Sequence, residues 1–303
     1  MSLPPIVAVV GATAAGKTSL SLELAEALGG EIVNTDAMQV YRGMDVGTAK
    51  APPAERRGIP HHLLDEYDVG DPVSVADLQQ RARELVASLR ADGRLPVLVG
   101  GSALYTRAIL DRFEIPPTDP AVRARVEAQM HELGLERMHA RLAALDPEAA
   151  ERISGGNGRR IIRALEVIEI TGRPFAASLP PLVYADPHSV QIGVDIDRPT
   201  LDVRIEQRVD EMFEAGFAEE VARLVPQGLL ESRTAKMAIG YREVADALAG
   251  RMTLDQARDL TVQRTRRFAR RQDAWFRKDP RIVWVRYDDP DRVEQALAAV
   301  RAL

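Results

Sequence analysis

The sequence predicts an α/β protein in which a parallel sheet core is interrupted by a helical insertion. An apolar, β-branched run at 6–10 is followed by a glycine-containing loop and an amphipathic pattern over 17–28, which is the order strand, loop, helix. Strand-like and helix-like segments alternate to about residue 110, as in a doubly wound sheet. From Pro116 the chain changes to segments rich in Ala, Arg and Glu, which predict helices outside the sheet.

The remaining core elements follow from short apolar runs. Residues 31–34 and 95–99 predict buried parallel strands, and a helix is expected between them over about 75–90. Residues 190–196 and 281–287 predict two more strands, with helices between them. The expected division is a first part of the core at 1–115, a helical insertion at 116–187 and a second part of the core at 188–303.

The composition excludes several classes of protein. The 303 residues contain no cysteine, which excludes disulfides, thiolate zinc sites and iron–sulfur clusters. No apolar run approaches the roughly 20 residues of a membrane span, and the N-terminus lacks the pattern of a secretory leader, so we expect a cytoplasmic protein without a membrane partner. The 40 basic and 45 acidic side chains give a net charge of −5. Taken alone, that sum argues against a nucleic-acid partner.

The loop after the first predicted strand matches the phosphate-binding pattern G-x-x-x-x-G-K-[ST] and stands in the expected context between strand and helix. Its glycines allow a tight path, its backbone N–H groups and the helix N-terminus attract an anion, the lysine adds a mobile positive charge, and the last hydroxyl can ligate Mg²⁺. The predicted diphosphate-binding residues of the loop are Gly11, Ala12, Thr13, Ala14, Ala15, Gly16, Lys17 and Thr18.

The motif does not by itself identify the phosphate compound. NTPases usually carry an acidic Mg²⁺ ligand after a later apolar strand, whereas here residues 95–99 run into Gly100, Gly101 and Ser102. The nearest carboxylate at a strand end is Asp36, in the crevice where open α/β sheets bind ligands. Asp36 could ligate Mg²⁺ indirectly, act as a base toward an acceptor, or cap its loop. Phosphoryl transfer and a transfer that expels diphosphate both fit.

Seven motifs, in order and at compatible spacing, resemble those of the tRNA dimethylallyltransferases, also called tRNA isopentenylpyrophosphate transferases. They are residues 11–18 (GATAAGKT), 36–50 (DAMQVYRGMDVGTAK), 60–63 (PHHL), 99–105 (VGGSALY), 163–167 (RALEV), 239–242 (IGYR) and 265–272 (TRRFARRQ). The resemblance covers essentially the whole chain. Because eukaryotic relatives carry a C-terminal zinc finger and this chain has no cysteine, it is similar to the bacterial form.

The resemblance implies a P-loop NTPase-like core and transfer of a dimethylallyl group from dimethylallyl diphosphate to N6 of the adenosine immediately 3′ of the tRNA anticodon. It makes Asp36 the general base, with Thr13 and Lys17 as further catalytic residues, Thr18 as the contact to the cofactor Mg²⁺, and Arg208 as a second diphosphate contact. For Arg208, a surface helix charge is the alternative. Direct displacement and a carbocation-like state both remain open for the allyl carbon.

The tRNA-binding residues are also implied by the resemblance. They are Asp36, Ala37, Met38, Gln39, Ser102, Arg123, Arg159, Arg160, Arg163, Gly240, Tyr241 and Arg242. Ala37 and Ser102 depart from the usual Ser and Thr of the family, and Met237 stands where a polar side chain is common. The local charge supports an RNA partner, since residues 231–286 contain 14 basic and 7 acidic side chains.

Helical spacing within this basic segment predicts a face for RNA phosphates, although a solvated helix is the alternative. Five arginines fall within eight residues: Arg264, Arg266, Arg267, Arg270 and Arg271. Phe268 and Trp275 lie close together on the same helical wheel, and packing into the core is favoured over base stacking. The adjacent His61 and His62 predict a hydrogen-bonded loop rather than a metal site.

Two other functions compete with tRNA prenylation. Adenylate isopentenyltransferases share the phosphate loop and the catalytic Asp but need no insertion to grip tRNA, so the long insertion and the basic segment disfavour them. A P-loop NTPase or kinase is disfavoured by the missing acidic strand end. The expected partners are the tRNA anticodon stem-loop and dimethylallyl diphosphate, and the expected state is a monomer.

Overall fold

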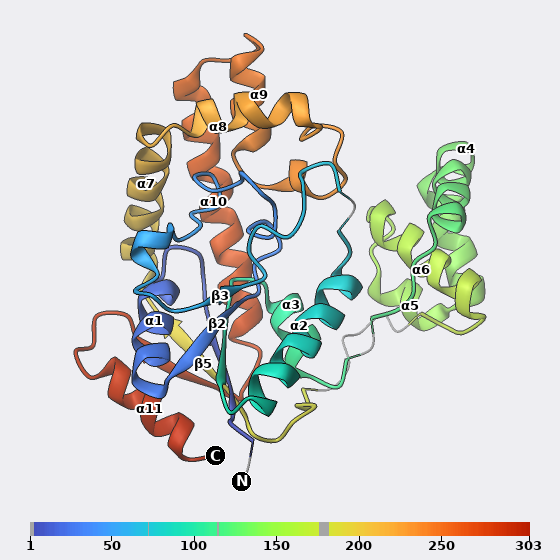
Figure 1. Ribbon diagram of the computed structural model, residues 1–303. Coiled ribbons are helices and arrows are strands. Elements are labelled where there is room, and N and C mark those ends of the chain that lie inside the picture. The colour runs from blue at the N-terminus through green and yellow to red at the C-terminus, as the bar shows by residue number, and fades with distance from the viewer. Residues whose placement is uncertain (1–2, 72, 114, 176–181) are drawn as a thin grey trace. The chain divides into compact units, whose positions relative to one another are not determined.

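The computed structural model describes residues 3–71, 73–113, 115–175 and 182–303. Within these residues, six parallel strands form one sheet in the order β3-β2-β4-β1-β5-β6 (Figure 1). The strands are β1 (Ile6–Val10), β2 (Gly30–Asn34), β3 (His61–His62), β4 (Leu95–Val99), β5 (Ser189–Asp195) and β6 (Ile282–Arg286). The parallel α/β class predicted from the sequence is therefore confirmed.

Helices account for most of the remaining chain. The helices of the sheet-containing unit are α1 (Lys17–Leu28), α2 (Val75–Ala91), α3 (Ala103–Leu110), α7 (Arg198–Glu214), α8 (Phe217–Leu224), α9 (Tyr241–Leu248), α10 (Leu254–Phe276) and α11 (Arg292–Arg301). Short 3₁₀ turns lie at Pro53–Glu55, Val225–Gln227 and Ala235–Met237. None of the helices within the described ranges is both long enough and apolar enough to cross a bilayer.

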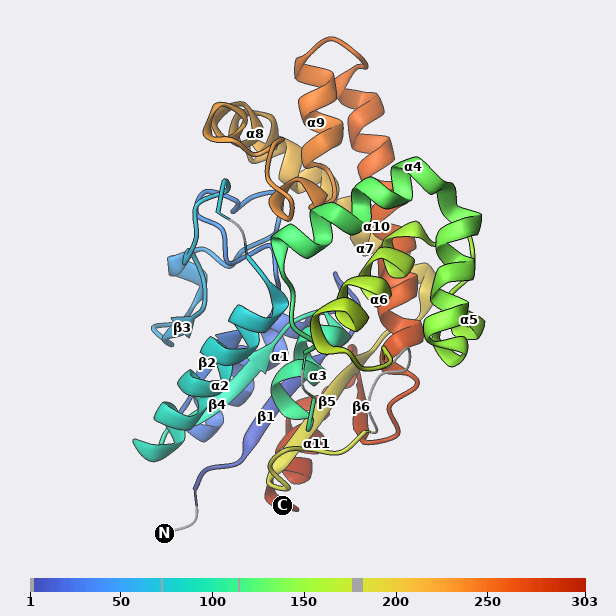
Figure 2. The ribbon, with the colours of Figure 1, turned by 90° about the vertical axis from the view of Figure 1, so that its right-hand side faces the viewer.

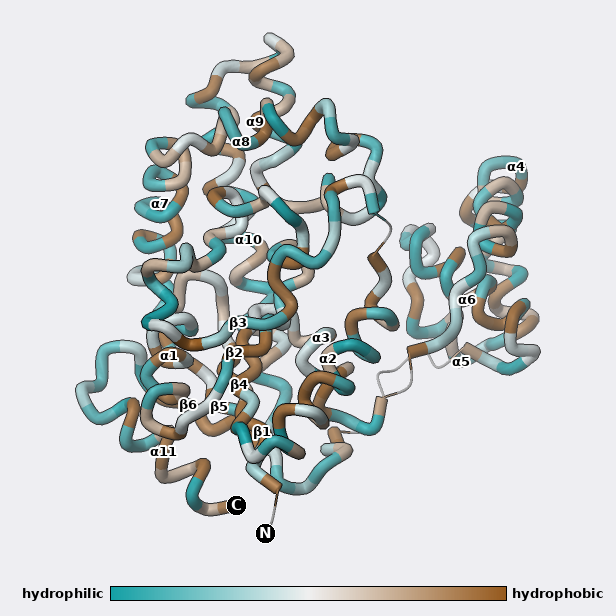
Figure 3. Tube along the Cα trace, in the orientation of Figure 1, coloured by the Kyte–Doolittle hydropathy of each residue, from teal (hydrophilic) through white to brown (hydrophobic). Residues whose placement is uncertain are grey.

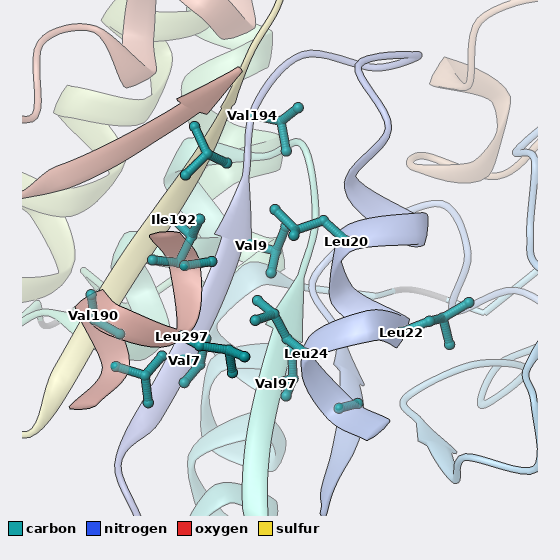
Figure 4. Packing of buried hydrophobic residues seen from close by; sticks show 14 of the residues in the cluster. Val7, Val9, Leu20, Leu22, Leu24, Val97, Val190, Ile192, Val194 and Leu297 are labelled. Atoms are coloured by element: carbon teal, nitrogen blue, oxygen red, sulfur yellow. The ribbon is translucent and has the colours of Figure 1, made fainter. Parts of the chain in front are cut away.

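One face of the sheet is covered by α1 and α11. The β-branched side chains of β1, β4 and β5 line this face, and Figure 4 shows Leu20 and Leu24 of α1 and Leu297 of α11 packed against Val7 and Val9. Val7 pairs in register with Val97 on one side and Val190 on the other. The central strand β1 is apolar and buried throughout because helices cover both faces of the parallel sheet there.

The opposite face carries α2, α3 and the end of α10, where Val86, Ile109 and Phe276 pack against the alternate residues of β1 and β4. Figure 3 shows apolar residues gathered along the strands and alternating apolar and polar residues along surface helices such as α7. This three-layer arrangement brings the carboxyl ends of β1, β2, β4 and β5 to one edge of the sheet, where open α/β folds bind their ligands.

A second apolar cluster lies under the loop that follows β2. Val40, Tyr41 and Met44 of this loop pack against α8 and α9. Helix α10 contacts α9 and α7 along its length, and Figure 2 shows α9 and α10 side by side. The long helix α10 therefore runs from this second cluster down to the edge of the sheet.

The helical insertion forms a compact unit of its own over residues 112–183. It contains α4 (Pro120–Leu145), α5 (Pro147–Arg152) and α6 (Gly158–Thr171), which share a core that includes Val126, Leu142 and Ile161. The sequence placed the boundaries at 116 and 187, and each lies four residues later than the boundary in the structure. Gly134 interrupts α4 with a non-helical backbone, so the helix is bent there.

The short strand β3 was not predicted from the sequence. His61 and His62 pair with Ile32 and Val33 at the sheet edge. Both imidazoles are hydrogen-bonded, His61 Nδ1 to the Ile59 carbonyl at 2.8 Å and His62 Nε2 to the Glu31 carboxylate at 2.6 Å. Among the described residues no three His, Asp or Glu side chains are grouped so as to hold a metal ion.

Candidate active site

The phosphate-binding loop joins β1 to α1, and the N–H groups of Thr13 and Ala15 donate to Gln272 and to the Ala12 carbonyl. Gly16 precedes the helix with φ of +104°, in a region that residues with a β-carbon rarely adopt. No described side chain caps the first turn of α1, so its N–H groups are not satisfied within the helix. Together with the positive end of the helix dipole, they form a site for an anion.

Lys17 lies at the centre of this site. Its Nζ donates a hydrogen bond to the Ala12 carbonyl at 2.8 Å. Burial, with a smaller contribution from the Arg208 guanidinium, lowers the pKa of Lys17 to about 8, while the Asp36 carboxylate acts in the opposite direction. The charges of Arg208 and Asp36 therefore lie close enough to Lys17 to act on its amine, although the three residues are far apart in the sequence.

Arg208 approaches Lys17 from α7. Burial lowers the pKa of its guanidinium, the Glu211 carboxylate opposes that effect, and the Arg204 guanidinium adds to it. No carboxylate of the described residues lies within ion-pair distance of Arg208, and its side chain is only partly exposed. Arg208 is thus not a fully exposed surface charge, and its contact with diphosphate stays a prediction.

Asp36 follows β2 and is fixed by its neighbours. The Asn34 amide accepts a hydrogen bond from the Asp36 N–H at 2.9 Å and donates to the carbonyls of Asp36 and Leu63, both at 3.0 Å. The Asp36 Oδ1 accepts the N–H of Met38 at 2.9 Å, and no described group donates to Oδ2. Capping of the loop therefore uses one carboxylate oxygen and leaves the other able to accept a proton.

Gln272 of α10 joins two loops of the site. Its Oε1 accepts the Thr13 N–H at 2.9 Å and its Nε2 donates to the Gly101 carbonyl at 2.8 Å. The side chain is 6% exposed. Sequence reasoning missed this role, since Gln272 was identified only as the last residue of the motif 265–272. The polar residue that ends this motif, directly after Arg271, was the available signal.

The geometry explains why β4 lacks the acidic strand end of NTPases. A β-carbon on Gly100 would stand 2.1 Å from Thr35 Oγ1, and one on Gly101 would stand 2.2 Å from Gln272 Nε2. Side chains larger than hydrogen would collide with these neighbours. The space that a carboxylate would need is therefore filled by Thr35 and Gln272.

A buried carboxylate from α8 holds the loop that carries Asp36. Glu220 is 1% exposed and accepts the N–H groups of Asp45, Val46 and Gly47 at 2.9, 2.7 and 3.1 Å. The Tyr241 hydroxyl donates to the same carboxylate at 2.6 Å. These bonds fix the far end of the loop against α8 and α9.

Comparison with known proteins supplies the family. The family model for IPP transferases matches residues 39–279. The chain belongs to the IPP transferase family. A tRNA dimethylallyltransferase from a Nocardioides species is 68% identical over 98% of this chain and 96% of its own length, and one from Streptomyces coelicolor is 58% identical over 96% and 93%. The crystal structure of a tRNA isopentenylpyrophosphate transferase from Bacillus halodurans has a TM-score of 0.70 and 39% identity, covering 98% of this chain and 95% of that one.

Within this IPP transferase, the predicted tRNA contacts next to Asp36 fall on the same fixed loop. Ala37 and Met38 are partly buried against the second cluster. Gln39 donates its amide to the carbonyls of Thr48 and Ala49 at 3.0 and 3.4 Å, and the hydroxyl of Ser102 caps α3 by accepting the Tyr105 N–H. Their roles toward tRNA stay predictions.

Tyr241 differs from the rest of the predicted set. Its ring is fully buried against Phe217, and its hydroxyl is taken by Glu220. Gly240 is also buried. The Tyr241 ring is therefore not accessible to tRNA in this structure. Arg242 is exposed, has no partner among the described residues and stays a predicted tRNA contact.

The insertion separates its four predicted arginines into two kinds. Arg163 and Arg123 approach the buried carboxylate of Glu166 at 2.9 and 3.4 Å. Arg159 and Arg160, at the start of α6, are exposed and have no side-chain partner within the described ranges. Only the second pair has all its guanidinium donors available for a ligand.

The arginines of α10 divide in the same way. Arg264 pairs with Glu243, and Arg266 pairs with Glu206 at 2.6 Å. Arg267, Arg270 and Arg271 are exposed and form no ion pair among the described residues. Trp275 is 42% exposed, and the residue next to it, Phe276, is buried in its place. Phe268 is partly buried.

Proposed function

We propose that this protein transfers a dimethylallyl group from dimethylallyl diphosphate to N6 of the adenosine immediately 3′ of the anticodon in tRNA, and releases diphosphate. The observation that carries the proposal is that Asp36, with one carboxylate oxygen available, lies close enough to Lys17 of the phosphate-binding loop to act on the pKa of its amine. Family membership supports the same reaction.

The reaction forms one bond and breaks another. The N6 nitrogen attacks the allylic carbon, the carbon–oxygen bond to diphosphate breaks, and its electron pair leaves with the diphosphate. An exocyclic amine bonded to a purine is a weak nucleophile, and its proton becomes acidic as the new bond forms. Oδ2 of Asp36 accepts that proton, while the Met38 N–H keeps the carboxylate oriented through Oδ1.

The leaving group is stabilised by the phosphate-binding loop. Negative charge grows on the diphosphate as the bond breaks, and the loop N–H groups, Lys17 and Arg208 are positioned before the reaction starts. Gln272 keeps Thr13 in place from the opposite side. These groups act on the departing charge rather than on the acceptor.

Mg²⁺ is proposed as the cofactor, with Thr18 as its protein contact. The Thr18 side chain is exposed at the N-terminus of α1, and its hydroxyl has no partner among the described residues. Mg²⁺ keeps several waters and binds through substrate phosphates with few protein ligands, so a single hydroxyl fits this ion. When bound, it would neutralise charge on the diphosphate.

The target adenosine must leave its stacked position to meet Asp36, at a cost of a few kcal/mol. Exposed arginines can offset this cost by contacting flanking phosphates, and Arg242, Arg267 and Arg271 are available for that. Because the phosphate loop, Asp36, α7 and α10 belong to one chain, we also propose that a monomer is sufficient.

The test mixes the protein with Mg²⁺, labelled dimethylallyl diphosphate and either a tRNA bearing adenosine 3′ of the anticodon or free AMP. Label is expected in the tRNA, and nucleoside analysis should find it on N6 of that adenosine. A tRNA with guanosine at the same position is the matched control and should remain unlabelled. Label entering AMP but not tRNA would overturn the proposal.

A further inference from the structure

A guanidinium that sequence reasoning did not select lies over the phosphate-binding loop. Arg204 stands one helical turn before Arg208 on α7. Its Nη1 is 3.8 Å from the point where a β-carbon on Gly16 would stand. Arg204 therefore reaches the N-terminus of α1, where the anion site of the loop is formed.

The hydrogen-bond donors of Arg204 have no acceptor in the part of the chain that the structure describes. No described residue accepts a hydrogen bond from its guanidinium or forms an ion pair with it, although the side chain is partly buried. The charge of Arg204 contributes to lowering the pKa of Asp288, but both carboxylate oxygens of Asp288 already accept hydrogen bonds from Arg286 at 3.0 Å. A guanidinium has five N–H donors, and leaving them all unmatched beside another cation is unfavourable without a ligand.

Tyr287 holds Arg204 in this position. The guanidinium carbon lies 4.5 Å from the centre of the Tyr287 ring, within the range of a cation–π contact. The ring is fixed because Tyr287 follows β6, its N–H donates to the Asp195 carbonyl at 2.9 Å, and its side chain packs against the sheet core. The contact with the Tyr287 ring orients the Arg204 guanidinium and uses none of its N–H groups.

We propose that Arg204 is a second diphosphate-binding guanidinium and that the ring of Tyr287 positions it over the loop. The inference rests on the diphosphate site of the proposed function. Lys17, Arg208 and Arg204 supply three positive charges to one space, which suits a diphosphate and exceeds what a single phosphate needs. Arginine forks bind phosphate oxygens in pairs, so two of them on successive turns can hold the two phosphates separately.

The experiment measures binding of inorganic diphosphate in the presence of Mg²⁺ by calorimetry, using the full chain. Arg204→Met should weaken binding by roughly 10- to 100-fold, as expected for loss of charge-assisted hydrogen bonds. Arg301→Met is the matched control: Arg301 is exposed and paired with Glu294 on α11, so removing its charge should leave the affinity within twofold. Thermal unfolding of each variant verifies that it is folded.

The positioning role of Tyr287 is tested in proteins with and without the Arg204 guanidinium. Tyr287→Leu should weaken diphosphate binding by about 2- to 5-fold, whereas Tyr287→Phe, which keeps the ring, should bind like the unmodified protein. If Tyr287 acts through Arg204, Tyr287→Leu should have no further effect once Arg204 is Met. An equal loss in both backgrounds would show that the ring serves the fold instead.

Two outcomes separate this inference from the proposed function. Diphosphate affinity of Arg204→Met within twofold of the unmodified protein would overturn the inference, whatever the enzyme prenylates. Conversely, a protein that binds inorganic diphosphate through Arg204 but places no label in tRNA would overturn the proposed function and support the inference. Arg204→Lys, which keeps the charge and loses the fork, should lie between Met and Arg.

Discussion

The phosphate-binding region and the helical insertion use arginine in opposite ways. In the first, Lys17 and Arg208 lie in one partly buried space, and no described carboxylate pairs with Arg208. In the insertion, Arg163 and Arg123 meet the fully buried carboxylate of Glu166, which also accepts the Thr118 hydroxyl at 2.5 Å. Burial acts to raise the pKa of Glu166, but the hydrogen bonds from Thr118 and Arg163 outweigh it and hold that pKa below its ordinary value.

This difference separates the charges that stabilise the fold from those that are unpaired and can bind a ligand. A buried cation that lacks an acid is unfavourable in the free protein and becomes favourable when an anion binds. An arginine that is already paired with a buried carboxylate gains less from binding a phosphate. The same sorting applies along α10, where Arg264 and Arg266 are paired and Arg267 and Arg271 are not.

The largest effect is expected at Asp36. Asp36→Asn keeps the size and the hydrogen bond to Met38 but removes the base, so turnover in single-turnover assays should fall by about 10²-fold or more. Affinities for diphosphate and tRNA should change little. Loss of binding with unchanged turnover would show that Asp36 is not the base.

Glu166 tests the other side of the comparison. Glu166→Gln removes the charge that satisfies two arginines, which should destabilise the insertion by about 2–3 kcal/mol. Hydrogen exchange followed by mass spectrometry should show faster exchange in α4 and α6 but not in α1. Glu169→Gln, at a partly exposed acid paired with Arg125, is the control and should cost under about 1 kcal/mol. Equal effects would remove the distinction between the two acids.

Gln272 should affect the active site more than the stability of the fold. Gln272→Leu breaks both bonds to Thr13 and Gly101, and we expect kcat to fall by roughly 10-fold because the loop is less well positioned. Wild-type kcat in the Leu variant would contradict this role.

Proton binding by Lys17 should make diphosphate affinity depend on pH. With a pKa of about 8, Lys17 is mostly charged at pH 7 and mostly neutral at pH 9, so affinity should decline above pH 8, by up to about tenfold per pH unit. Lys17→Met provides the baseline, because its own pH dependence reports only the ionisation of diphosphate. The ratio of the two affinities should fall as pH rises, and a flat ratio would contradict the lowered pKa.

The smallest predicted effect concerns the exposed arginines of α10. Reversing Arg267 and Arg271 to Glu should weaken tRNA binding and reduce the slope of log affinity against log salt by about two. Reversal of Arg57 and Arg301, which pair with Glu26 and Glu294 away from α10, makes the same change in net charge and is the control. An unchanged slope would place Arg267 and Arg271 off the RNA.

Local pattern was enough to predict the phosphate loop and every described strand except β3. The helix expected at 17–28 has those bounds, and the strand expected at 95–99 does as well, because a β-branched run and a glycine turn are set by neighbours in the chain. The identity of Asp36 as a carboxylate at a strand end also followed from local order. Its role came from family resemblance and remains to be tested.

Contacts between distant residues could not be predicted in this way. Gln272 lies 171 residues from Gly101, and Glu220 lies 175 residues from Asp45. A helical wheel also cannot tell which arginine will meet an acid on another helix, so Arg266 was grouped with Arg267 although Glu206 neutralises it. The wheel also placed Trp275 in the core, whereas the next residue, Phe276, is buried and Trp275 is exposed.

The Glu220 carboxylate has a consequence for the rate of catalysis. Three successive N–H groups surround it, as loop N–H groups surround a phosphate, so the protein's own side chain occupies an anion site permanently. The loss of chain entropy on ordering residues 45–47 is therefore incurred during folding, and not again in each catalytic cycle. The loop that presents Asp36 is ready before either substrate arrives, so its ordering adds no step between association and chemistry.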